Sequence, residues 1–106
     1  TWNQIYQTIA DAAAVEPNLV HIPSDLIAAY DSQLGDNFLG DKAHSMIFDN
    51  TKLRRVVPDF NPTIPFSQGA REIVAWHDAD PARQVVNHEY DSLSDQIIAA
   101  YGRAWP

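Results

Sequence analysis

Apolar side chains recur at helical spacing from the first residues of the chain. They occupy one stripe made of Trp2, Ile5, Tyr6, Ile9, Ala10 and Ala13. Thr1 followed by Gln4 is the pattern of a capping box, in which two side chains satisfy backbone N–H groups at a helix start. The sequence therefore predicts an amphipathic helix that ends near Ala14.

Four later segments carry the same helical signals. Ser24 and Asp25 cap a short helix, Asp49 or Asn50 caps a second one, and Pro65 suits the first turn of a third. Asn87 precedes the most regular stripe of the chain. The expected helices cover residues 24–30, 50–58, 65–80 and 87–105.

Two segments favour β-strands instead. Leu19 to Ile22 is short and β-branched, and residues 43–48 alternate between His44, Met46 and Phe48 on one side and smaller residues on the other. The polar, glycine-containing residues 31–41 predict a surface loop. The sequence thus predicts an α+β fold, a mostly helical small domain of about five helices with two short strands.

Length and composition bound the protein further. A chain of 106 residues allows one domain, residues 1–106, and the absence of cysteine excludes disulfides and fits a cytoplasmic location. No apolar run is long enough for a membrane span. A net charge of −7 disfavours nucleic acid and anionic membranes as partners.

The order of several short motifs resembles the carboxy-terminal part of extended short-chain dehydrogenase/reductases, the NAD-dependent epimerase/dehydratase family. Asp49 and Lys52 match its Asp-x-x-Lys, and a proline-containing turn follows. The Pro-Φ-x-x-Gly helix start and the Ala-Trp pair are then matched by Pro65, Phe66, Gly69, Ala75 and Trp76. The flanking segments TWNQIYQTIADAA and LVHIPSDLIAAYD also resemble this family, so the resemblance covers nearly the whole chain. The pattern PSDLIAAYD with FDNTKLRRVVPDF most resembles a poorly characterised bacterial branch of it.

The resemblance implies a substrate-binding domain whose parent protein uses NAD or NADP on a sugar-like or hydroxyl/ketone substrate. The amino-terminal Rossmann cofactor domain of that family is absent from this chain. Its phosphate-binding glycines are not found, because the four glycines are scattered, and no tyrosine has a lysine four residues later. We therefore expect no catalytic group and no cofactor site in these residues, and we expect an enzyme only in the parent protein.

Lys42, His44 and Ser45 are the candidate substrate-binding residues, since the family places a segment that closes over the substrate there. Lys42 belongs, with Lys52, Arg54 and Arg55, to the only basic stretch of an acidic chain. A lysine and a histidine could bind a phosphate or a sugar hydroxyl. Leu39 to Ala43 lacks the Arg-Pro-Gly-Asp of sugar-nucleotide epimerases, which argues against a nucleotide-sugar. The alternative is that these are ordinary loop and edge-strand residues.

Two other sequence features have simpler explanations than a site. His77 to Asp80 could share a divalent cation, but the end of a helix explains them better. The three tryptophans belong to apolar helix stripes and are expected to pack in a core or an interface. A rival hypothesis makes the chain a free-standing acidic helical module for protein interaction. Under the enzyme hypothesis the partner is the cofactor domain, and exposed apolar surface could also drive self-association.

Overall fold

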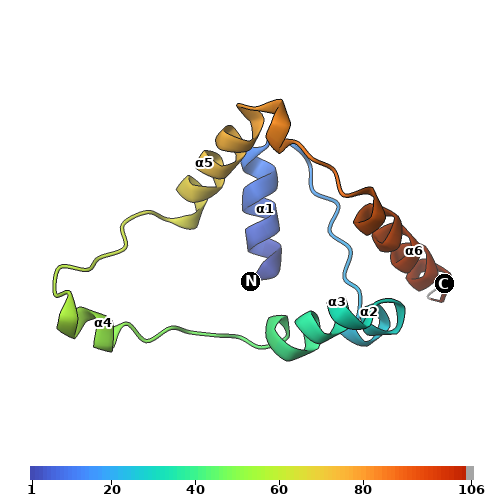
Figure 1. The fold of residues 1–106 in the computed structure, drawn as a ribbon, viewed down its shortest axis with the longest axis horizontal. Coiled ribbons are helices and arrows are strands. Elements are labelled where there is room, and N and C mark those ends of the chain that lie inside the picture. Colours follow the sequence, from blue (N-terminus) through green and yellow to red (C-terminus); the bar gives the residue numbers. More distant parts are fainter. Residues whose placement is uncertain (105–106) are drawn as a thin grey trace. The chain divides into compact units, whose positions relative to one another are not determined.

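Helices form all the regular structure of residues 1–104, the part of the chain that the computed structural model describes. The α-helices are α1 (Trp2–Ala12), α2 (Ser24–Tyr30), α3 (Ser32–Asn37), α4 (Thr51–Val56), α5 (Phe66–Asp78) and α6 (His88–Ala104) (Figure 1). A π-helical turn, η1 (Phe38–Lys42), follows α3, and a 3₁₀ turn, η2 (Pro81–Arg83), follows α5. The described residues contain no strand, so the predicted α+β fold is wrong and this part of the chain is all-helical.

The two predicted strands fail because a strand needs a partner for its backbone hydrogen bonds. Residues 19–22 and 43–48 belong to no regular element, and neither segment is paired with a strand by a ladder of backbone hydrogen bonds in the described residues. The only such bonds at residues 43–48 are local: the N–H of Ala43 and that of His44 donate to the carbonyls of Phe38 and Asp41. The side-chain pattern of both segments suits a β-sheet, but the described residues contain no other strand with which they could pair.

The predicted loop at residues 31–41 is also wrong, because most of it is helical. The carboxylate of Asp31 accepts a hydrogen bond from the N–H of Leu34 at 2.9 Å, which caps α3. The Ala43 N–H reaches back five residues to the Phe38 carbonyl at 2.8 Å, the spacing of a π turn. The chain therefore continues as a helix through the glycines that suggested a loop.

Close contacts divide the chain into two units. The first unit comprises Thr1–Leu19 and Asp49–Val86, and in it α1 packs against α5 (Figure 1). Ala10 of α1 and Ala70 of α5 are its buried apolar residues, and such small side chains let two helices approach closely. Helix α4 contacts no other described element.

The second unit comprises Val20–Phe48 and residues 87–104. Here α2 packs against α3 and contacts α6. Gly35 of α3 is buried against Ala28 of α2, and Ile97 of α6 is the buried apolar side chain of this unit. Both units therefore have very small cores, and many large apolar side chains of the described residues are exposed.

The length and polarity of the helices also bear on membranes. Among the described residues, none of the helices combines the length and the apolar character that crossing a bilayer requires.

Candidate functional site

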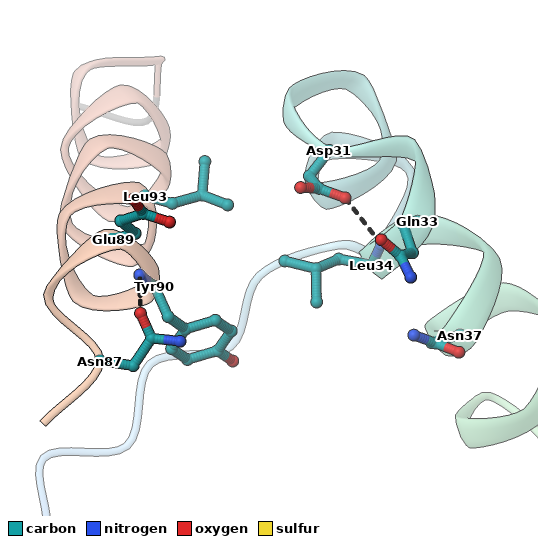
Figure 2. Close-up of a pocket in the computed structure, with 8 residues that line it drawn as sticks. All are labelled: Asp31, Gln33, Leu34, Asn37, Asn87, Glu89, Tyr90 and Leu93. Atoms are coloured by element: carbon teal, nitrogen blue, oxygen red, sulfur yellow. Dashed lines mark hydrogen bonds between the residues drawn. The ribbon is translucent and has the colours of Figure 1, made fainter. Parts of the chain in front are cut away.

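The second unit has an open groove on its surface. This groove has a volume of about 440 Å³ and lies between α3 and α6 (Figure 2). Eight residues line it: Asp31, Gln33, Leu34, Asn37, Asn87, Glu89, Tyr90 and Leu93. Its volume falls in the range of small-molecule sites, roughly 300–1,000 Å³.

Two capping interactions fix the helix ends that border the groove. Asp31 Oδ1 accepts a hydrogen bond from the Leu34 N–H at 2.9 Å, and Asn87 Oδ1 accepts one from the Tyr90 N–H at 3.1 Å. Each cap sets where its helix begins and hence which residues of the first turns face the groove. The predicted capping role of Asn87 is confirmed.

The groove combines an apolar surface with unpaired polar groups. The side chains of Leu34, Leu93 and Tyr90 extend into the space between the two helices (Figure 2). The side chains of Gln33, Asn37 and Glu89 and the hydroxyl of Tyr90 make no hydrogen bond with any described residue. They remain available to a ligand, with amide donors and acceptors from Gln33 and Asn37, a carboxylate from Glu89 and a phenol from Tyr90.

The predicted substrate-binding residues lie elsewhere in the second unit. Lys42 ends η1 and pairs with the neighbouring carboxylate of Asp41, and both side chains are about half exposed. His44 and Ser45 follow it and are exposed. The structure brings these residues together only as neighbours in the chain, and none of the three lines the groove. Their role in substrate binding stays a prediction.

The groove residues were only partly visible in the sequence. Asn87 is the predicted cap, and Tyr90 and Leu93 belong to the apolar stripe that follows it, but neither signal indicates that these residues face a second helix. Asp31 is followed by Leu34 and Phe38 at helical spacing, which is the signal for α3 that the glycines obscured. Local sequence patterns do not indicate that α3 lies opposite α6 across the groove.

The groups at His77 and Asp49 have local roles. His77 Nδ1 lies 2.9 Å from a carboxylate oxygen of the adjacent Asp78, and in the described residues no group of three or more His, Cys, Asp or Glu side chains could hold a metal ion. The Asp49 carboxylate accepts hydrogen bonds from the hydroxyl and the N–H of Thr51, at 2.6 and 2.9 Å. These two bonds, the hydroxyl first, lower the pKa of Asp49 and stabilise the start of α4.

Comparisons of the chain with models of protein families, with curated proteins and with solved structures found no match.

Proposed function

We propose that this chain is the substrate-binding, carboxy-terminal portion of a protein similar to NAD-dependent epimerase/dehydratases, with the α3–α6 groove as a contact surface for the substrate. In this proposal NAD or NADP is bound by a cofactor domain outside the chain, which also supplies the catalytic groups. The substrate is sugar-like, or another small molecule with a hydroxyl or ketone group. The location is cytoplasmic, which fits the absence of cysteine.

The observation that carries the proposal is the pairing of free hydrogen-bonding groups with apolar ones in a single groove. A sugar-like molecule presents hydroxyls that both donate and accept, and the amides of Gln33 and Asn37 can meet them in either sense. Its C–H faces need apolar contacts, which Leu34, Leu93 and the Tyr90 ring can supply.

The exposed apolar side chains of the first unit give independent support. Trp2 and Tyr6 on α1, and Ile73 and Trp76 on α5, are each at least half exposed. Two packed helices form a single layer, and helices usually bury their apolar stripes against a second layer. A cofactor domain would provide that layer. The same side chains also favour the alternative, a free-standing acidic helical module that docks onto a partner protein.

The coding sequence that precedes the Thr1 codon distinguishes the two functions. The proposal expects it to encode a glycine-rich βαβ start followed by Tyr-x-x-x-Lys. The full-length protein should then bind NAD or NADP in calorimetry, whereas the present chain alone should bind neither. Absence of both motifs upstream, or micromolar affinity of the present chain for either nucleotide, would refute the proposal and leave the interaction module.

Kinetics of the full-length protein locate the substrate contacts. Asn37→Ala should raise KM with a smaller effect on kcat, because a contact made in both ground and transition state acts on binding. The parallel variants Lys42→Ala and His44→Ala test the segment that the family resemblance indicates. An unchanged KM in Asn37→Ala, with a raised one in the other two, would move the substrate surface from the groove to residues 42–45.

A further inference from the structure

The second unit carries most of the negative charge of the protein. Over Val20–Phe48 and residues 87–104 there are seven acidic side chains against two basic ones, Lys42 and Arg103, so the net side-chain charge is −5. The whole chain has −7. A ligand that approaches this unit therefore meets a negative field, which attracts cations and repels anions.

The residues that line the groove also have a negative net charge. Asp31 and Glu89 contribute two carboxylates, and no basic side chain is among the described residues that line it. The first turns of α3 and α6 oppose them, because a helix start carries about half a positive charge. That opposition is partial: α3 has only six residues, and the Leu34 and Tyr90 N–H groups already donate to Asp31 and Asn87. Two full negative charges outweigh the two helix ends.

The side chains around Glu89 suit a cationic nitrogen on a short carbon frame. The Glu89 carboxylate has no partner among the described residues and can accept a charge-assisted hydrogen bond. The half-exposed ring of Tyr90 offers a face for a cation. Leu34 and Leu93 can contact the carbon atoms next to the nitrogen.

We infer that the groove selects small polar ligands that carry a cationic nitrogen over neutral or anionic ligands of the same shape. The inference rests on the proposed function, in which the groove contacts a small substrate, and it names the class of substrate. It separates this groove from a phosphate or diphosphate site, which would need basic side chains or free helix N–H groups.

Three hexoses of the same ring size test the selection. Glucosamine, glucose and glucose 6-phosphate are titrated into the isotope-labelled chain at about pH 6.5, where an amine is protonated, and amide shifts of residues 31–37 and 87–93 are followed by NMR. Glucosamine should shift these amides with a dissociation constant roughly ten-fold lower than that of glucose. Glucose 6-phosphate should bind more weakly than glucose.

Variants separate a local contact from the general field. Glu89→Gln keeps the shape of the side chain and should weaken glucosamine about ten-fold and glucose much less, because only the ammonium group gains a charge-assisted hydrogen bond from the carboxylate. Asp95→Asn removes the same charge from α6 outside the groove lining and should have little effect. Circular dichroism and unperturbed amides of the second unit away from the substituted residue confirm that each variant keeps its fold.

Each other outcome overturns the inference. Equal affinity for glucose and glucosamine would remove the charge selection and leave the proposed function intact. Tighter binding of glucose 6-phosphate than of glucose would show that the groove prefers anionic ligands. Equal effects of Glu89→Gln and Asp95→Asn would show that the net charge of the second unit, and not a contact with Glu89, produces the selection. Absence of shifts with all three sugars would exclude the groove as their site, whereas the upstream sequence and nucleotide binding test the proposed function separately.

Discussion

The contact between Gly35 of α3 and Ala28 of α2 is very close. A Cβ added at Gly35 would overlap the Cβ and the Cα of Ala28, so α2 and α3 approach through a position that only glycine can occupy. The overlap involves backbone as well as side chain, so it cannot be relieved by a rotamer change.

We expect Gly35→Ala to destabilise the second unit by about 1–3 kcal/mol, the usual cost of overpacking. The matched control is Gly69→Ala in α5, where an added Cβ meets nothing within 4 Å. At that position alanine should stabilise the helix by about 0.5–1 kcal/mol, because alanine loses less conformational entropy than glycine when the chain folds. Urea unfolding followed by circular dichroism measures both, and equal effects of the two changes would contradict the close α2–α3 contact.

The Asp49–Thr51 pair makes the start of α4 sensitive to pH. The pKa of Asp49 is lowered in the folded chain, mainly by the Thr51 hydroxyl and then by the Thr51 N–H. A lowered folded pKa means that the contribution to stability is present above the unfolded pKa and is lost as the pH falls through the folded one. The first turn of α4 should therefore fray in acid.

Replacing the hydroxyl tests this pH dependence. Thr51→Val keeps the N–H but removes the stronger bond, so the pKa of Asp49 should rise toward its ordinary value. Thr51→Ser keeps both bonds and should leave the pKa where it is. Titration of the Asp49 carboxyl carbon by NMR measures the shift. An identical pKa in the valine and serine variants would show that the hydroxyl bond is absent in solution.

At the scale of elements, helix ends determine where segments stop. Helix α1 is followed by its C-cap Ala13 and then by Ala14, whose φ of 56° lies in the left-handed region that usually takes glycine. The Val15 N–H donates to the Ala10 carbonyl at 3.0 Å and the Ala14 N–H to the Asp11 carbonyl at 3.2 Å. These two bonds are the pattern of a Schellman motif, here built without its usual glycine.

Ala14→Gly should therefore stabilise α1 by about 1 kcal/mol, because glycine adopts a positive φ without a Cβ clash. Ala13→Gly is the matched control one residue earlier. Its φ is −83°, a value that alanine adopts freely, so glycine there should destabilise the helix end. Thermal unfolding of both variants measures the difference, and a loss of stability in Ala14→Gly would contradict the left-handed end.

The elements differ in how far the sequence could predict them. Helices α1, α2, α4, α5 and α6 lie close to their expected bounds. The caps at Thr1 and Asn87, the position of Pro65 and a period of 3.6 are the local signals for them, whereas the predicted cap of α2 by Ser24 and Asp25 is wrong, because α2 follows Pro23 without a side-chain cap. The strands at residues 19–22 and 43–48 were wrong because pairing depends on a neighbour that no local pattern specifies. Polar residues and glycines at positions 31–41 favour a loop in the sequence, whereas Gly35 in fact serves the close contact of α3 with Ala28. The groove depends on that same tertiary contact.

The whole molecule is limited by how little apolar surface it buries. Among the described residues only Ala10, Ala70 and Ile97 are buried apolar side chains, although apolar residues make up 45% of the sequence. Apolar area removed from water is the main favourable term in folding, at roughly 25 cal/mol per Å². The exposed rings and branched side chains of α1 and α5 are therefore expected to find another surface in solution.

We expect the purified chain to bind an apolar fluorescent dye and to self-associate as its concentration rises, because Trp2, Tyr6, Ile73 and Trp76 stay exposed in the first unit. Changing Ile73 and Trp76 together to glutamine should lower both dye binding and the sedimentation coefficient, with helix content unchanged. Val86→Gln, an exposed apolar residue of the same unit outside its helices, is the control and should change neither. A monodisperse monomer without dye binding would mean that these side chains are covered within the chain, and would remove the independent support that they give to a docking partner.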